Sequence, residues 1–269
     1  MRYVDVKVID YEHEGRISAE SLLEHNFPTV DCFWLITTGR SGTLRLAYML
    51  DALRTIDACH EPWPALTYEG RLAIEGKPLP DEAAIRLLHN SRARFVEGSY
   101  KRYGNYFECS LFLSHIAEQI KKAFTAARFV HLIRHPKKFI VSGIAKNWFN
   151  RDTVIGHLWP NVPDESWETW QRLAWLWNEI HSKGLDLENK YGPVIVHRLL
   201  AEDLYENVES FDKLLMWMGC NKYDAQAARG NYWDQMVNKS ENDDKPKWAP
   251  AWNSFLEETC GETMSKIYG

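Results

Sequence analysis

Two short segments of the sequence combine glycine, hydroxyl and guanidinium groups in the way that anion-binding sites do. The first lies between an apolar run and a segment of helical spacing and reads Thr37-Thr38-Gly39-Arg40-Ser41-Gly42-Thr43. Glycines at such a position let backbone N–H groups approach an anion, and the helix N-terminus adds its dipole. The simpler alternative is a glycine turn that only joins a strand to a helix. The segment is not a Walker A motif, because Leu44-Arg45 stands where Gly-Lys-Ser would appear.

The second segment follows another apolar run later in the chain. Arg134 comes directly after this run, and Ser142 lies one or two turns into the helix expected next. An arginine at a strand end and a serine on the following helix can converge on one phosphate, the arginine through paired hydrogen bonds and the serine as a donor. The alternative for Arg134 alone is a surface salt bridge.

Short apolar runs alternate with amphipathic segments along the chain, and this alternation predicts the fold class. We expect strands at Cys32–Thr38, Ile56–Cys59, Tyr106–Cys109, Arg128–Ile133 and Val194–His197. We expect helices at Thr43–Leu53, Asp81–Phe95, Phe112–Phe124, from Pro136 onward, Ser166–Asn189, Val208–Met218 and Ala251–Ile267. The pattern is typical of an α/β fold with a parallel sheet of four to five strands flanked by helices. Ligands of such folds bind at the carboxyl ends of strands, where both anion-binding segments lie.

Length and composition narrow the class of protein. The 269 residues suit one domain over residues 1–269, and 45% hydrophobic with 26% charged residues excludes disorder. A net charge of −5 argues against a nucleic-acid binder, and no apolar run approaches the ~20 residues of a membrane helix. Five scattered cysteines without a C-x-x-C pair indicate neither a disulfide framework nor a zinc site. With no secretory signal visible, we expect a cytoplasmic protein with no bound metal.

Together these features resemble the PAPS-dependent sulfotransferase family, whose P-loop-NTPase-like fold is also a parallel sheet between helices. Arg40-Ser41-Gly42-Thr43 is similar to the family's 5′-phosphosulfate loop, and Arg134-x-Pro136-x5-Ser142 is similar to its 3′-phosphate motif. Glu61-Pro62 and the terminal segment Cys260–Met264 extend the resemblance over most of the chain. An arginine in the loop, in place of a lysine, resembles the carbohydrate, protein and bacterial branches.

The resemblance implies transfer of a sulfuryl group from 3′-phosphoadenosine 5′-phosphosulfate (PAPS) to a hydroxyl or amine of a small-molecule or carbohydrate acceptor, with PAP as product and no metal. It assigns the 5′ side of the donor to Thr38, Gly39, Arg40, Ser41, Gly42, Thr43 and Leu44, and the 3′-phosphate to Arg134 and Ser142. In the family, a late basic loop closes over the 3′-phosphate. Asn238 and Lys239 are the candidates here, slightly ahead of the stretch from Lys245 to Lys247.

An acceptor hydroxyl needs a general base, and three residues at predicted strand ends are candidates: His60, Glu61 and Glu108. Histidine titrates nearest to neutral pH when unperturbed. Glu61 falls where the arginine-loop branches carry a glutamate, which makes it the preferred base by resemblance. Glu108 stands in a region where several branches place a lysine, and its alternative is a structural acid at a strand end.

The segment 147–165 combines prolines, a glycine and polar residues, and we expect it to be a lid or an acceptor-binding segment. Trp167, Trp170 and Trp177 recur at helical spacing after it. Core packing is the first interpretation of this stripe, and an aromatic acceptor pocket is the alternative. Two other functions stay open, a small-molecule kinase with a P-loop-like site and a non-catalytic nucleotide-binding protein on the same fold.

Overall fold

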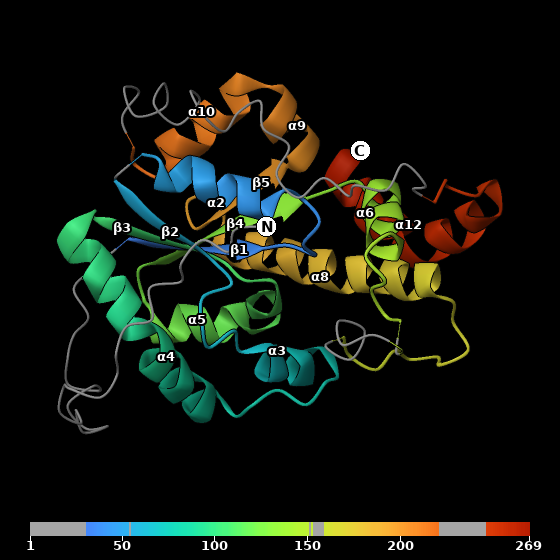
Figure 1. Cartoon of the computed structure of the whole chain (residues 1–269), viewed down its shortest axis with the longest axis horizontal. Coiled ribbons are helices and arrows are strands. Elements are labelled where there is room, and N and C mark those ends of the chain that lie inside the picture. The colour runs from blue at the N-terminus through green and yellow to red at the C-terminus, as the bar shows by residue number, and fades with distance from the viewer. Residues whose placement is uncertain (1–30, 54, 151, 153–158, 221–245) are drawn as a thin grey trace.

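Five short parallel strands form one sheet at the centre of the molecule (Figure 1). The structure is a computed structural model that describes residues 31–53, 55–150, 152, 159–220 and 246–269. The strands are β1 (Cys32–Ile36), β2 (Ile56–His60), β3 (Asn105–Cys109), β4 (Ala127–Ile133) and β5 (Val196–Leu200). Their order across the sheet is β2-β3-β1-β4-β5, and every neighbouring pair is parallel. The predicted α/β fold class is confirmed.

Strand β1 occupies the middle of the sheet because both of its faces are apolar. Its residues, Cys32–Ile36, are all buried. Cys32 pairs with Tyr106 of β3 on one side and with Ala127 of β4 on the other. The chain leaves β1 for the outer strand β2 and later returns to β3 and β4. The carboxyl end of β1 is therefore a switch point, which is where open α/β sheets bind ligands.

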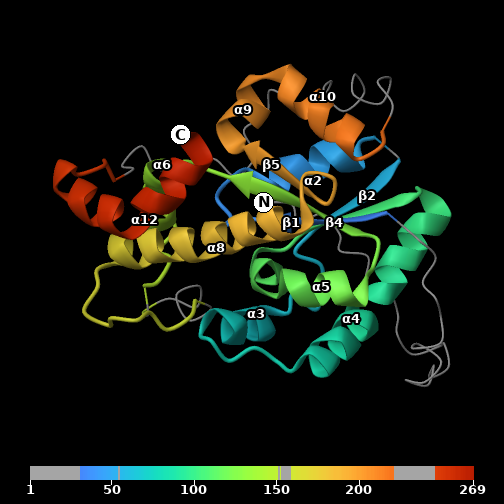
Figure 2. The same cartoon turned by 180° about the vertical axis from the view of Figure 1, so that it is seen from behind.

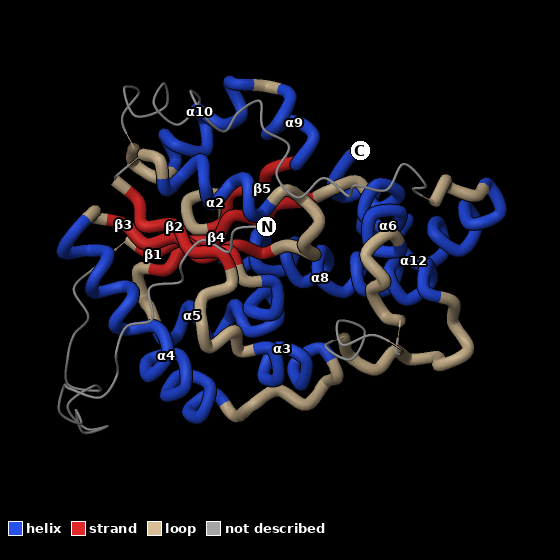
Figure 3. The backbone as a smooth tube through the Cα atoms, viewed as in Figure 1, coloured by secondary structure: helices blue, strands red, loops and turns tan. Residues whose placement is uncertain are grey.

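Helices cover both faces of the sheet (Figures 1 and 3). Phe33 and Leu35 face one apolar cluster, to which α2 (Thr43–Asp51), α9 (Ala201–Glu206) and α10 (Val208–Trp217) contribute. Trp34 and Ile36 face the other cluster. Its helices are α3 (Thr67–Ile74), α4 (Asp81–Arg102), α5 (Ala117–Ala123), α6 (Pro136–Ile144), α8 (Thr169–Tyr191) and α12 (Asn253–Tyr268), with the 3-10 turn η1 (Leu111–Ile116). Of these, α3, α4 and α5 lie below the sheet in Figure 1 and in the view from behind in Figure 2. A second 3-10 turn, η2 (Pro250–Trp252), directly precedes α12.

Most expected elements lie within a few residues of the observed ones, with three differences. Helix α4 continues to Arg102 instead of ending at Phe95, and α3 and α9 were not predicted. The fifth strand was placed too early at Val194–His197. Val196 pairs with Phe129 and Leu200 with Ile133, whereas Val194 is 72% exposed. The shift matters for the site, because it moves residues 201–206 to the carboxyl edge of the sheet.

The first interpretation of the tryptophan stripe is confirmed for Trp177, which lies in the core, while Trp167 and Trp170 are half-buried and pack against it. Trp177 is fully buried, and its Nε1 donates a hydrogen bond to the carbonyl oxygen of Arg134 at 2.8 Å. The ring of Trp170 stacks on that of Trp252 at 5.0 Å. Helix α8 thus supports the end of β4. No helix among the described residues has the length and apolar character to cross a membrane.

Candidate functional site

A cavity of about 740 Å³ opens at the carboxyl edge of the sheet. All five strands deliver side chains to it: Arg40 and Thr43 follow β1, Glu61 follows β2, Cys109 ends β3, Arg134 follows β4, and Glu202 follows β5. Helix α6 adds Lys138 and Ser142. The volume is in the range of cavities that enclose a small ligand or cofactor.

The loop from β1 to α2 presents its backbone to this cavity. Gly39, Arg40 and Gly42 all have positive φ angles, of 76°, 53° and 82°. Successive residues of this kind turn backbone N–H groups toward one point, which suits an anion. Below the loop, Thr37 Oγ1 lies 2.8 Å from Ser41 Oγ and accepts a hydrogen bond from Gly39 N at 3.2 Å. The hydroxyl of Ser41 therefore contacts the buried Thr37 side chain, and these hydrogen bonds stabilise the shape of the loop.

The floor of the loop is made of buried hydroxyl groups. Ser114 Oγ accepts a hydrogen bond from Thr37 N at 3.0 Å, and it also lies 3.2 Å from Thr37 O. Thr38 is fully buried and its hydroxyl donates to Gly39 O at 3.1 Å, so its side chain does not line the cavity. Thr38 therefore supports the loop from behind.

Gly42 directly precedes helix α2 and lies in close contact with Tyr205. The Tyr205 hydroxyl donates a hydrogen bond to Gly42 O at 2.6 Å, and a Cβ on Gly42 would lie 2.5 Å from the tyrosine ring. No described side chain caps this helix end. The first-turn N–H groups of α2 therefore stay available to an anion in the cavity.

We expect Gly42→Ala to lower the free energy of unfolding by about 2–5 kcal/mol, because it adds left-handed strain to a steric clash. Gly76 is the matched control, since its φ is 73° and a Cβ there would meet nothing within 4 Å. Gly76→Ala should cost only about 1–2 kcal/mol. Urea denaturation measures both. Equal losses would mean that the Tyr205 contact does not constrain the loop.

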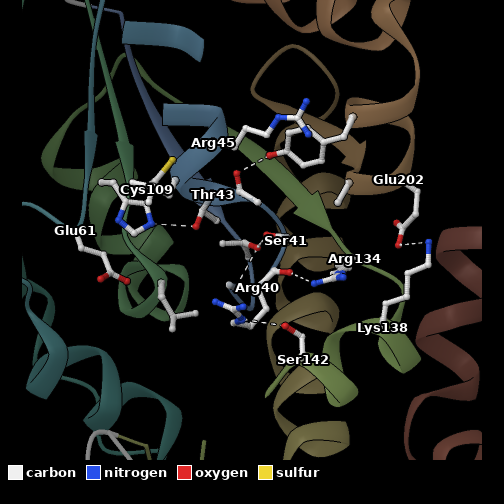
Figure 4. A pocket seen from close by; sticks show the side chains of 18 of the residues that line it. Arg40, Ser41, Thr43, Arg45, Glu61, Cys109, Arg134, Lys138, Ser142 and Glu202 are labelled. Carbon is white, nitrogen blue, oxygen red and sulfur yellow. Dashed lines mark hydrogen bonds and ion pairs between the residues drawn. The ribbon is translucent and has the colours of Figure 1, made fainter. Parts of the chain in front are cut away.

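Arg40, Arg134 and Ser142 converge on one side of the loop (Figure 4). Arg40 Nε donates to Ser142 Oγ at 3.0 Å. Arg134 Nη1 donates to the carbonyl oxygen of Arg40. Arg40 and Arg134 are 94 residues apart in the sequence. The two anion-binding segments are therefore joined by direct hydrogen bonds.

Neither guanidinium group has a carboxylate at contact distance within the described part of the chain. No described carboxylate lies within an ion-pair distance of Arg40 or Arg134. Burial lowers the pKa of Arg40, and the positive charge of Arg134 lowers it further. Burial also lowers the pKa of Arg134, against an opposing effect of the Glu202 carboxylate. A bound anion would relieve this unfavourable accumulation of positive charge.

A third cation and a carboxylate complete this side of the cavity. Lys138 Nζ lies 3.4 Å from Glu202 Oε1, and the same oxygen accepts a hydrogen bond from His135 N at 3.3 Å. Neither side chain was predicted from the sequence. Lys138 lies four residues after Arg134, in the first turn of α6, so its position in the sequence could have indicated it. Glu202 was missed because the fifth strand was predicted to end at His197, whereas it ends at Leu200, two residues before Glu202.

The three candidate bases lie in different surroundings. Glu61 is exposed at the cavity wall, and its carboxylate has no hydrogen bond or ion pair among the described residues. His60 Nε2 lies 3.0 Å from Thr43 Oγ1, and burial lowers the pKa of the imidazole despite the nearby Glu61 charge. Glu108 does not line the cavity, because it is fully buried in a bidentate ion pair with Arg92.

Other sequence candidates have mixed outcomes. Leu44 lines the cavity, whereas Asn238, Lys239 and Lys245 lie outside the described residues. Arg45 lies over the ring of Tyr205, 4.7 Å from its centroid, and Tyr205 was not predicted. Trp148 lines the cavity with its ring 4.2 Å from that of Trp159. A lid role for 147–165, several residues of which are not described, stays a prediction.

Metal ligands do not gather in the described part of the chain, where no three His, Cys, Asp or Glu side chains are placed to hold an ion. No disulfide joins any of the five cysteines, all of which lie in the described part of the chain. Burial raises the pKa of the Cys109 thiol at the cavity well above its ordinary value, and nearby carboxylates add to this effect. The thiol therefore stays protonated and is a poor nucleophile.

Solved structures of sulfotransferases resemble this fold over most of the chain. The sulfotransferase domain from the curacin biosynthetic pathway aligns with a TM-score of 0.55 and 13% identity over 88% of this chain and 96% of that domain. The sulfotransferase domain from the Synechococcus PCC 7002 olefin synthase gives 0.55 and 14% over 88% and 94%. Sulfotransferase STF9 from Mycobacterium avium gives 0.55 and 14% over 93% and 79%.

Sequence comparison does not add to this likeness. No protein-family model matches the chain, and no curated protein matches its sequence. At 13–14% identity the likeness is one of architecture. The all-parallel sheet and the cavity at the carboxyl end of β1 agree with the fold that the sequence predicted. The chain therefore has the fold of the sulfotransferases.

Proposed function

We propose that this protein transfers a sulfuryl group from PAPS to a hydroxyl or amine of a small-molecule or carbohydrate acceptor. One observation carries the proposal. The Arg40 loop and the Arg134–Ser142 segment, similar to the two anion-binding motifs of sulfotransferases, are bonded to each other at one cavity. The sulfotransferase fold supports the same conclusion.

The residues present fit a donor with anionic groups at two positions. The N–H groups of the β1–α2 loop, with Arg40, suit the 5′-phosphosulfate, because they pair a helix N-terminus with a cation. Arg134, Ser142 and Lys138 suit the 3′-phosphate as cations and a hydroxyl donor. A site that neutralises both groups would distinguish PAP from ADP, which has no 3′-phosphate.

PAPS supplies an activated sulfuryl group and leaves as PAP. The chain's own task is to stabilise charge and to move one proton. Arg40 lies in the loop where its charge can stabilise the developing negative charge on the 5′-phosphate. Glu61, on the β2 side of the cavity (Figure 4), would accept the proton of the acceptor hydroxyl. The acceptor would enter between them.

Isothermal titration with PAP, ADP and ATP, with and without Mg²⁺, tests the class of function. We expect PAP to bind tightly with or without EDTA, and we expect neither ADP nor ATP to bind tightly. Binding of ATP that depends on Mg²⁺ would instead favour the kinase alternative. PAP binding without sulfuryl transfer to any acceptor in a broad panel of alcohols, phenols, sugars and amines would favour a non-catalytic nucleotide-binding protein.

Arg134→Ala should weaken PAP binding by about 1.5–3 kcal/mol, or about 10–150-fold, because a charge-assisted contact to the 3′-phosphate is lost. Adenosine 5′-phosphate, which lacks that phosphate, should bind the variant almost as well as the wild type. Calorimetry measures both ligands. Equal losses for the two would show that Arg134 acts only through its bond to the Arg40 carbonyl group.

Glu202→Gln should strengthen PAP binding about 2–5-fold, because the carboxylate competes with the phosphate for Lys138 in a partly exposed ion pair. Glu206→Gln is the control, since Glu206 lines the same cavity without an ion pair among the described residues. It should change the affinity less. Weaker PAP binding by Glu202→Gln would instead mean that Glu202 holds Lys138 in its binding position.

A further inference from the structure

A fully buried arginine of helix α4 lies directly behind the loop that carries Glu61. Arg92 is 0% exposed and faces Glu108 of strand β3, which is also 0% exposed. Arg92 Nε donates to Glu108 Oε2 at 2.7 Å and Nη2 donates to Glu108 Oε1 at 3.0 Å. This two-point contact fixes both the position and the plane of the guanidinium group.

Glu108 holds the arginine rigidly because its remaining acceptor sites are also occupied. The Tyr106 hydroxyl donates to Oε2 at 2.6 Å, and the Ser110 hydroxyl donates to Oε1 at 2.6 Å. The carboxylate therefore accepts four hydrogen bonds from buried groups. An isolated buried ion pair adds little stability over a well-packed apolar pair. The Arg92–Glu108 pair does, however, fix the direction of the remaining N–H groups of Arg92.

The second N–H of Arg92 Nη2 points at the backbone just beyond Glu61, whereas Nη1 donates to Ser91 O within α4 at 3.4 Å. Arg92 Nη2 donates to Pro64 O at 2.8 Å and lies 3.5 Å from Pro62 O. On the other side, Glu61 N donates to Cys109 O at 3.0 Å. Glu61 itself has a positive φ of 49°, a conformation that a non-glycine residue keeps only when its surroundings hold it. Glu61 is therefore anchored on both sides.

We propose that Arg92, oriented by Glu108, is a positioning residue that fixes the turn 61–64 and so aims the Glu61 carboxylate into the cavity. The role in catalysis rests on the proposed function, in which Glu61 is the base. The anchoring of the turn does not rest on it. We call the contact of Arg92 with the Pro64 carbonyl group the bracket. Because a displacement of about 1 Å at a reacting group can lower a rate about 10²-fold, we expect loss of the bracket to lower kcat.

Two variants separate anchoring from simple core stability. Arg92→Lys keeps a positive charge opposite Glu108 but, with one nitrogen, cannot also reach the Pro64 carbonyl group in the same geometry. The double variant Arg92→Met with Glu108→Met replaces the ion pair by apolar side chains of similar length, an exchange that often preserves stability. Both variants remove the bracket.

The first readout is hydrogen–deuterium exchange of the segment 61–66, which needs neither donor nor acceptor. Both variants should exchange faster there than the wild type, with the β1–α2 loop unchanged. The second readout is kinetic. We expect kcat to fall about 10–100-fold, with PAP affinity within about twofold of the wild type. Thermal denaturation confirms that each variant is folded.

A folded variant with wild-type exchange at 61–66 and wild-type kcat would overturn the proposal, as would failure of both variants to fold, because the pair would then serve folding alone. Faster exchange with unchanged kcat would overturn the catalytic role of the bracket. If the wild type neither binds PAP nor transfers a sulfuryl group, the proposed function fails, and the exchange result still decides whether Arg92 anchors the turn.

Discussion

Glu61→Gln is expected to lower kcat about 10²–10⁴-fold, with PAP affinity unchanged or improved. Glutamine keeps the shape of the side chain and removes its ability to accept a proton. The acceptor hydroxyl has a pKa far above neutrality, so its proton must be taken up as the new O–S bond forms. Because Glu61 is exposed at the cavity wall without a partner among the described residues, it is free to perform this step.

The same assay on two other variants tests the assignment. His60→Asn removes the imidazole beside Thr43, and Glu108→Gln weakens the buried pair with Arg92. His60→Asn should affect kcat less than Glu61→Gln does. Glu108→Gln should lower thermal stability, which Glu61→Gln should leave unchanged. A Glu61→Gln enzyme that keeps more than about a third of the wild-type kcat would contradict the assignment, and the His60 variant would then name the alternative base.

The fold was predictable where burial makes the sequence pattern unambiguous. Strand β1 reads as an unbroken apolar run because helices cover both of its faces. Strand β5 lies at the sheet edge, and His197 and Arg198 interrupt its apolar residues, so the sequence pattern alone does not fix where the strand begins and ends. The pairing of Val196 with Phe129 of β4 determines its position in the sheet. That pairing is distant in sequence and leaves no local signal.

The sequence was sufficient to place Arg40 and Arg134 at the site, but not Lys138 or the residues that hold these cations. Arg40 and Arg134 follow apolar strands directly, and a parallel sheet places the carboxyl ends of its strands at one edge. Glu108 could not be separated from Glu61 by position, since each falls at a strand end. What separates them is Arg92, which reaches Glu108 from α4 across the sheet face. An amphipathic pattern does not reveal such a buried ion pair.

Arg40→Ala is expected to lower kcat on the order of 10²-fold or more and to weaken PAP binding much less. The positive charge of Arg40 is needed most when the oxygen between sulfur and the departing 5′-phosphate becomes anionic. In the proposed function, the N–H groups of the loop and of helix α2 are available to bind the same phosphate in the ground state without Arg40. Steady-state kinetics at saturating donor and calorimetry with PAP give the two quantities.

Two further variants decide how Arg40 acts. Arg40→Lys keeps the charge but loses the planar group whose Nε contacts Ser142, so an intermediate kcat is expected if charge dominates. Lys138→Ala removes a cation from the 3′-phosphate side of the same cavity and should weaken PAP binding with little effect on kcat. If Arg40→Ala instead loses PAP affinity while kcat at saturation survives, Arg40 is an anchor for the donor. The transition-state charge must then be stabilised by the loop N–H groups, because the proposed function assigns Arg134 and Lys138 to the 3′-phosphate.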